Sequence, residues 1–162
     1  MAVSIDGYVA TLDHSTDWVS DNDWEVFGNR VKEAGCIVMG RKTMETSGDD
    51  FPYEGAVNIV LTKKPELLKE SDRVVVTNKR PREVIELAME KGFLEVLIIG
   101  GGKTNSSFLK EGLIDEIVIS VHPIILGKGV RLFEDFEGQV ELEKNEVKEA
   151  HELVWIKYRI IK

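Results

Sequence analysis

Residues 94–109 read LEVLIIGGGKTNSSFL, an apolar run that breaks at three glycines and then resumes with a helical pattern. A short apolar run without polar alternation is typical of a strand that is buried on both faces of a sheet. Glycines permit close backbone approach, and a helix that begins directly after them directs its first N–H groups at the space above. This stretch predicts either a pyrophosphate site or a tight strand-to-helix turn without a ligand, and both interpretations remain open at this point.

The rest of the chain alternates between strand-like and helix-like patterns up to Gly112. Strands are expected at 1–5, 36–39, 57–61, 73–76 and 94–99, and helices are expected after Ser20, Gly40, Arg80 and Gly101. This order implies crossover connections and a largely parallel sheet. A further strand at 116–121 is followed by segments 139–147 and 152–160 without an intervening helix, which predicts an antiparallel hairpin.

We therefore expect an α/β fold in a single domain of residues 1–162. The predicted architecture is a mostly parallel central sheet with an antiparallel C-terminal hairpin and helices on both faces.

Composition narrows the classes of function. The formal net charge of -8 argues against nucleic-acid or anionic-membrane binding, because phosphate groups need a basic surface. No apolar run is long enough to cross a bilayer, and no signal-peptide pattern opens the chain. The single cysteine, Cys36, cannot form an internal disulfide and is expected to be a buried, inert thiol. A lone cysteine favours a reducing compartment, so we expect a cytoplasmic protein. No Cys and His cluster has metal-ligand spacing, so we expect no metal site.

Cations gather where three of the expected parallel strands end. The segments are Gly40-Arg41-Lys42-Thr43, Thr62-Lys63-Lys64 and the glycine run with Lys103-Thr104. Ligands of open parallel sheets bind beyond the carboxyl ends of the strands. Each cation taken alone is typical of a solvated loop. Together with free N–H groups and hydroxyls, they suit a cofactor that bears a pyrophosphate and an additional phosphate.

Several motifs resemble known reductases. VMGRKT at 38–43, NIVLT at 58–62 and IGGG at 99–102, in this order, resemble the dihydrofolate reductase fold. AVSIDGYVA at 2–10 and the segment from His122-Pro123 through Gly127-Lys128-Gly129 to Phe133 resemble more specifically the C-terminal reductase domain of bacterial riboflavin biosynthesis proteins. That branch includes many small stand-alone members, and the resemblance covers essentially the whole chain. It implies NADPH as hydride donor and a homodimer.

The resemblance also implies site residues. Near the nicotinamide it places Ala2 and Val9. For the pyrophosphate and the ribose 2′-phosphate side it implies Gly40, Arg41, Lys42 and Thr43. Around the adenosine, with a lysine near the 2′-phosphate, it implies Leu61, Thr62 and Lys63. Around the pyrophosphate it implies Gly100, Gly101, Gly102, Lys103 and Thr104.

Asp23 is the candidate catalytic residue, because reduction of a C=N or C=O bond needs a proton as well as a hydride. In dihydrofolate reductases an acidic residue a few positions after a tryptophan contacts the pterin, and Trp18 and Asp23 have that placement. The pattern Ser20-x-x-Asp23 equally predicts a capping box, in which the carboxylate satisfies backbone N–H groups. The substrate-binding candidates by the same resemblance are Ser4, Asp23, Phe27 and Ser120.

Other polar and aromatic residues have structural interpretations. Asp6 is expected to be a turn residue, His122 a structural residue before Pro123, and Trp155 a core or dimer-interface residue. Support for a homodimer comes from the apolar residues of the terminal hairpin: Leu142, Val147, Leu153, Trp155 and Ile160.

The leading hypothesis is an NADPH-dependent reductase that acts on a small nitrogen heterocycle or a ribosylaminopyrimidine, resembling 5-amino-6-(5-phosphoribosylamino)uracil reductase. The chain shows no deaminase pattern with zinc ligands, so we do not expect the bifunctional enzyme. The alternatives are a pterin reductase of the dihydrofolate reductase type and a non-catalytic nucleotide-binding protein on the same scaffold.

Overall fold

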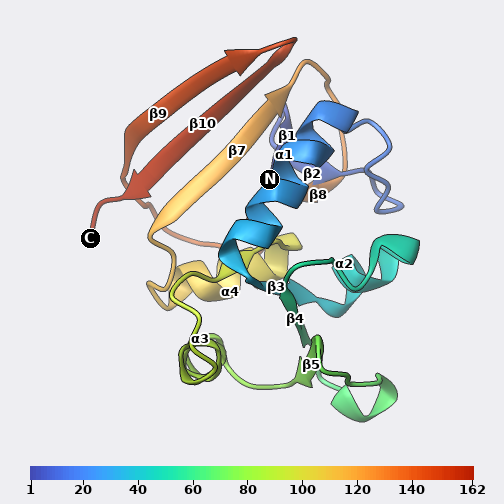
Figure 1. Cartoon of the computed structure of the whole chain (residues 1–162). Coiled ribbons are helices and arrows are strands. Elements are labelled where there is room, and N and C mark those ends of the chain that lie inside the picture. The colour runs from blue at the N-terminus through green and yellow to red at the C-terminus, as the bar shows by residue number, and fades with distance from the viewer.

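The computed structural model describes residues 1–162, and its first layer is a parallel sheet with strand order β5-β4-β3-β6 (Figure 1). The strands of this sheet are β3 (Cys36–Gly40), β4 (Val57–Leu61), β5 (Val74–Thr77) and β6 (Leu97–Ile98). The register aligns Gly40 with Leu61 and Leu61 with Thr77. The carboxyl ends of three neighbouring strands therefore open onto one edge of the sheet.

A second four-stranded sheet has the order β1-β7-β10-β9. Its strands are β1 (Ala2–Ser4), β7 (Glu116–His122), β9 (Leu142–Ala150) and β10 (Leu153–Ile160). Strand β1 pairs with β7 in parallel, whereas β10 is antiparallel to both β7 and β9. A short ribbon of β2 (Tyr8–Ala10) and β8 (Val130–Arg131) completes the strands.

Four α-helices connect and cover these strands. They are α1 (Asp21–Ala34), α2 (Arg41–Thr46), α3 (Pro81–Glu90) and α4 (Gly102–Lys110), with 3-10 turns at Gly48–Asp50 and Pro65–Leu67. Helix α1 begins where the Ser20 hydroxyl accepts a hydrogen bond from the Asp23 N–H, and it ends at Gly35, whose φ of 65° is left-handed. None of these helices combines the length and the apolar character that crossing a membrane requires.

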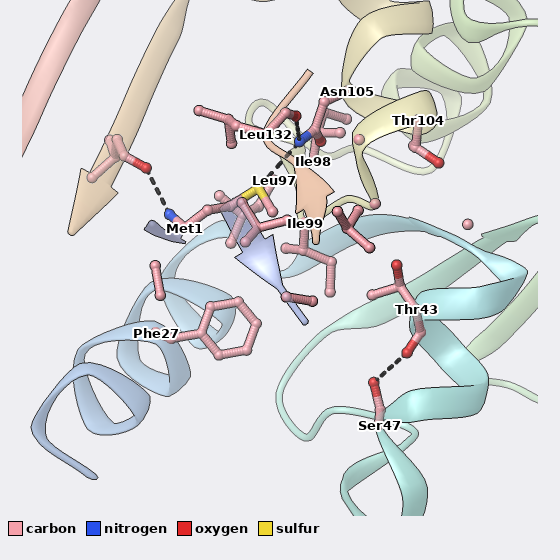
Figure 2. Close-up of a pocket in the computed structure, with 18 of the residues that line it drawn as sticks. Met1, Phe27, Thr43, Ser47, Leu97, Ile98, Ile99, Thr104, Asn105 and Leu132 are labelled. Atoms are coloured by element: carbon pink, nitrogen blue, oxygen red, sulfur yellow. Dashed lines mark hydrogen bonds between the residues drawn. The ribbon is translucent and has the colours of Figure 1, made fainter. Parts of the chain in front are cut away.

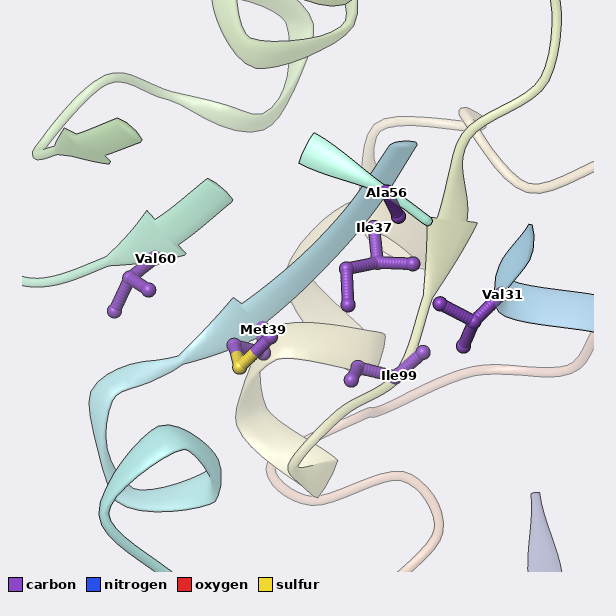
Figure 3. Packing of buried hydrophobic residues seen from close by; sticks show 6 residues of the cluster. All are labelled: Val31, Ile37, Met39, Ala56, Val60 and Ile99. Carbon is purple, nitrogen blue, oxygen red and sulfur yellow. The ribbon is translucent and has the colours of Figure 1, made fainter. Parts of the chain in front are cut away.

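The core divides according to the two faces of the parallel sheet. Side chains alternate along β3, so Ile37 and Met39 join Val31 of α1 in one cluster, shown in Figure 3. The intervening Cys36 and Val38 pack with α3 and α4 on the opposite face. Helices therefore cover both faces, and the predicted mixed α/β fold with a parallel and an antiparallel strand set is confirmed.

Burial decides the character of the single cysteine. Cys36 has no exposed surface, and this burial raises the pKa of its thiol to about 11. The thiol is therefore protonated and inaccessible, as the sequence predicts for an inert core residue.

Asp6 ties two distant loops together. Its carboxylate accepts hydrogen bonds from the Ser4 hydroxyl at 2.7 Å and from the N–H groups of Leu126 at 3.1 Å and Gly127 at 2.7 Å. The hydroxyl of Ser4, followed by these backbone donors, lowers the pKa of Asp6. Asp6 is thus a turn residue as predicted, and it also fastens the loop between β1 and β2 to the loop that follows β7.

Three details differ from the sequence expectations. Strand β9 runs from Leu142 to Ala150 instead of 139–147, because the turn between the hairpin strands lies at His151, whose φ is 56°. Strand β6 is limited to Leu97–Ile98, since only these residues pair with β3. The pairing of β8 with β2 joins segments about 120 residues apart, and no local pattern indicates it.

We predict that Ile37→Ala lowers the free energy of unfolding by about 2–5 kcal/mol, because it removes a fully buried side chain from the cluster of Figure 3. Urea unfolding measures this loss. The matched change Leu67→Ala, at a side chain that is 62% exposed, should stay within about 0.5 kcal/mol of the unmodified chain. Equal effects of the two substitutions would contradict the assigned core.

Candidate active site

A large cleft lies beyond the carboxyl edge of the parallel sheet and extends along α1 to the second sheet. Figure 2 shows Phe27 of α1 on one side of this cleft and Thr43 and Ser47 of the α2 region on the other. Met1 and the β6 residues Leu97 and Ile98 also line the cleft, and they lie above Phe27 in the view of Figure 2.

Most of the predicted cofactor residues line this cleft, and those at the carboxyl edge of the parallel sheet form one half of it. Those that line it are Ala2, Val9, Gly40, Arg41, Lys42, Thr43, Leu61, Thr62, Lys63, Gly101, Gly102, Lys103 and Thr104. Gly100 lies behind this lining, where its carbonyl accepts a hydrogen bond of 2.8 Å from the Gly40 N–H. The parallel register explains why residues more than 60 positions apart meet at this edge.

The glycine turn packs closely against neighbouring elements. A Cβ atom at Gly102 would lie 2.3 Å from the Arg131 carbonyl oxygen, so glycine is needed there for packing against β8. A Cβ at Gly40 would lie 2.8 Å from Thr104 Oγ1, so the beginnings of α2 and α4 approach each other closely. Both helices begin without a side-chain cap, and their first N–H groups point toward the space above the strand ends. The peptide between Gly100 and Gly101 is cis.

The cations at this edge are exposed, and two of them form single, long ion pairs. Arg41 lies 3.4 Å from Glu45 one helical turn away, and Lys103 lies 3.4 Å from Asp135. Exposed pairs of this kind contribute little to stability, so these side chains are available to an incoming anion. Lys63 lies two residues after the end of β4 and is exposed.

The structure adds a neighbouring basic segment that the sequence reasoning did not include. Thr77 ends β5 beside Leu61, and Asn78, Lys79 and Arg80 follow it. The sequence does indicate this segment, because Lys79 and Arg80 follow an apolar strand in the same way as Lys63 does. These residues extend the positive edge by one strand.

Asp23 is the central side chain of the other half of the cleft. Its Oδ2 accepts a hydrogen bond of 2.7 Å from the Ser120 hydroxyl, and its Oδ1 accepts one of 2.7 Å from the indole N–H of Trp155. The residue is only 7% exposed, yet Asp23, Ser120 and Trp155 all line the cleft. Each carboxylate oxygen therefore has one protein donor and keeps a further lone pair for a ligand.

The capping-box interpretation of Asp23 is half correct. Ser20 does accept a hydrogen bond from the Asp23 N–H, at 3.4 Å. The carboxylate does not return the bond, because the Ser20 N–H instead donates to His122 Nε2 at 3.4 Å. The backbone of Asp23 thus belongs to the cap, while its side chain is free to face Ser120 and Trp155.

His122 has structural contacts, in agreement with its sequence interpretation. Its ring packs edge-on against Trp18 with 5.2 Å between centroids, and its Nδ1 lies 3.3 Å from the Ser120 carbonyl oxygen. A ring with its proton on Nδ1 satisfies both this contact and the one from Ser20. His122 therefore supports the strand that carries Ser120.

Phe27 lines the cleft one helical turn beyond Asp23. It makes edge-to-face contacts with Trp24, with centroids 5.7 Å apart, and with Tyr53, with centroids 5.4 Å apart. Tyr53 is in turn 2.9 Å from Ser47 through its hydroxyl. These aromatic rings form an apolar surface beside the carboxylate, suited to a flat heterocycle.

The structure does not bring Ser4 into the cleft. Ser4 is 1% exposed, and its hydroxyl donates to Asp6 and accepts from the Tyr8 N–H at 3.0 Å. The hydroxyl is thus used within the turn between β1 and β2, which is the physical reason that it does not reach a substrate.

Two further cleft residues escaped the sequence reasoning. Trp155, interpreted as a core or interface residue, is the indole donor to Asp23, and only its register opposite Ser120 reveals this. Arg30 lines the cleft on α1, three residues after Phe27, so the helical spacing from Asp23 could have indicated it.

The chain also matches a known protein family. A family model described as the RibD C-terminal domain matches residues 1–155. The chain belongs to this family. A dihydrofolate reductase-like fold and a riboflavin-reductase-like relationship, both predicted from the motifs, are thereby confirmed.

Individual relatives agree with this placement. The uncharacterized Bacillus subtilis protein YwjB is 28% identical over 98% of this chain and 94% of its own length. The riboflavin biosynthesis protein RibD of Aquifex aeolicus is 25% identical over 93% of this chain, and the match spans 54% of RibD. The chain thus corresponds to about half the length of that relative.

Solved structures share the fold. A putative riboflavin biosynthesis protein from Shewanella sp. PV-4 has a TM-score of 0.81 and 30% identity, over 100% of this chain and 97% of the other. Dihydrofolate reductase from Schistosoma mansoni has a TM-score of 0.72 and 20% identity, over 99% of this chain and 95% of the other.

We predict that Trp155→Phe lowers the free energy of unfolding by about 1–3 kcal/mol, because it leaves a buried oxygen of Asp23 without its donor. Urea unfolding of Trp155→Phe, Asp23→Asn and the double variant measures the coupling between the two residues. We expect the double variant to lose less than the sum of the single losses. Additive losses would contradict a direct interaction, and Trp24→Phe, at a side chain that is 39% exposed, is the control.

Proposed function

We propose that the protein is an NADPH-dependent reductase of small nitrogen heterocycles of the pyrimidine or pterin type. The observation that carries this proposal is a single cleft with a cationic, glycine-lined half beside a half that contains a buried carboxylate. Membership of the RibD C-terminal domain family supports it.

The cofactor half suits NADPH in its chemistry. The approach of Gly40 to Thr104 brings two helix starts close enough to bind one diphosphate with backbone N–H groups. Arg41 and Lys63 would bind the additional phosphate that distinguishes NADPH from NADH. Ala2 and Val9 would contact the nicotinamide. When bound, NADPH supplies a hydride, that is, a proton with two electrons.

The substrate half supplies orientation and a path for the second proton. Asp23 accepts N–H groups of the heterocycle through its remaining lone pairs, and Phe27 contacts the ring. Ser120 bonds Asp23 and can donate or accept, so the pair can pass a proton from solvent to the reduced nitrogen or oxygen. The hydride adds to carbon and this proton completes the reduction.

A non-catalytic nucleotide-binding protein on the same scaffold remains the second candidate, because fold does not fix function. It predicts cofactor binding without consumption of the cofactor by any heterocycle. The absorbance of NADPH during incubation with pyrimidines and pterins distinguishes the two functions.

We predict that NADPH at about 100 times its dissociation constant stabilises the protein by about 2.7 kcal/mol, which thermal unfolding detects as a raised melting temperature. NADH should give a smaller rise. Arg41→Ala or Lys63→Ala should weaken binding about tenfold, equivalent to about 1.4 kcal/mol.

The matched control for this experiment is Arg159→Ala. Arg159 is exposed and paired with a glutamate as Arg41 is, but it lies on β10 outside the cleft. No rise with either nucleotide would end the proposal.

We also propose a homodimer through the face of β7, β10 and β9 that points away from α1. Because Ser120 and Trp155 face Asp23, strand alternation turns Ile119 and Ile156 to the opposite side. Val147 lies beside Ile156 and is 44% exposed. Figure 1 shows no helix next to β9 and β10 on that side.

Two residues that the sequence analysis assigned to the interface do not belong to it. Leu153 is buried, and Trp155 faces Asp23.

Sedimentation equilibrium at micromolar concentration should give twice the chain mass of 18.2 kDa. Val147→Glu should give the monomer, because it buries a charge in the interface. Lys148→Glu, its neighbour on the opposite face of β9, should leave the dimer intact. A monomeric unmodified chain would disprove this assembly.

A further inference from the structure

The two halves of the cleft carry opposite charge. Six Arg or Lys side chains line it, and five of them follow strands of the parallel sheet: Arg41, Lys42, Lys63, Lys64 and Lys103. The sixth, Arg30, lies on α1 in the half that holds Asp23. Most of the carboxylates lie on the side of α1, β6 and β7: Asp17, Asp21, Asp23, Glu95, Asp115 and Glu116. Of these, Glu116 is paired with Lys157 and Asp115 with Lys162, and two further carboxylates of the lining are Asp50 and Glu134.

Arg30 differs from Arg41, which has one glutamate at 3.4 Å, because two carboxylates lie closer to its guanidinium. Its Nη1 lies 2.8 Å from Glu33 Oε2, and its Nη2 lies 2.7 Å from Glu95 Oε1. The three side chains together carry one net negative charge. Glu95 itself lines the cleft, so a ligand that approaches Arg30 meets Glu95 at the same time.

The position of Arg30 fits the far end of a ligand that begins at Asp23. The two residues are seven positions apart on α1, with Phe27 between them on the same face, which corresponds to about 10 Å along the helix. A sugar phosphate attached to a heterocycle at Asp23 would extend over this distance. Its phosphate would have to displace Glu95 and remain beside Glu33, and such like-charge contacts act against binding.

We propose that the substrate half of the cleft accepts a phosphate-free, uncharged nitrogen heterocycle with N–H donors toward Asp23, and that the Arg30–Glu33–Glu95 cluster discriminates against a phosphorylated substrate. This inference rests on the proposed reductase function. It narrows the substrate from the phosphoribosyl class named for a structural neighbour to heterocycles without a phosphate.

The first test compares matched compounds on the NADPH-saturated protein. The probes are 5-amino-6-(5-phosphoribosylamino)uracil, the same compound after removal of its phosphate, and a dihydropterin. We expect the best phosphate-free probe to have kcat/KM at least about tenfold higher than the phosphate ester, as measured by cofactor absorbance.

Preference for the phosphate ester would overturn the proposal, and so would a failure of every phosphate-free probe to react. In both cases stabilisation by NADPH alone remains as a separate readout. Its loss, and not the substrate preference, is what would remove the underlying reductase function.

The second test removes negative charge beside Arg30, which should weaken the discrimination against the phosphate ester. Glu95→Gln removes one carboxylate from Arg30 at a side chain that is 53% exposed, so we expect the variant to fold. The kcat/KM of the phosphate ester relative to the phosphate-free probe should rise about tenfold. Glu143→Gln, which removes the carboxylate partner of Arg159 on β9, should leave this ratio unchanged. An unchanged ratio in Glu95→Gln would overturn the role of the cluster.

Discussion

Parallel pairing of β3 with β4 and β6 is the constraint on which the cleft depends. Side chains of β3 alternate between the α1 face and the α3–α4 face, and a shift of register by one residue would exchange them. Because both faces are buried, this register is fixed. The same register brings Gly40 beside Leu61 and sets the glycine turn next to the end of β3. The position of the loops that line the cationic half of the cleft therefore follows from the packing of the core.

The second sheet contributes the opposite wall. Its parallel strand pair β1–β7 carries Ser120, and β10 carries Trp155 in register with it. Helix α1 lies between the two sheets and contributes to both: Val31 packs in the core, while Asp23 faces β7 and β10. One amphipathic helix therefore joins the rigid interior to the polar site, and the carboxylate is oriented by strands that are distant in the sequence.

The sequence predicted those features that depend on local pattern. Apolar runs indicated β3 and β4, caps at Ser20 and Gly35 indicated α1, and the cations after strand ends indicated the positive edge. It could not predict contacts that join distant residues. The indole of Trp155 reaches Asp23 across 132 positions, and Arg30 reaches Glu95 across 65. Ser4 failed as a substrate candidate because its local partners, Asp6 and Tyr8, use its hydroxyl first.

The contact between Trp155 and Asp23 makes the site observable by light. Indole emission is sensitive to the charge and polarity around its ring, and the nitrogen of Trp155 bonds directly to the carboxylate that lines the cleft. The chain has two other tryptophans, Trp18 and Trp24. With these replaced by phenylalanine, the fluorescence of the remaining indole becomes an intrinsic probe of events at Asp23, without a dye or a label.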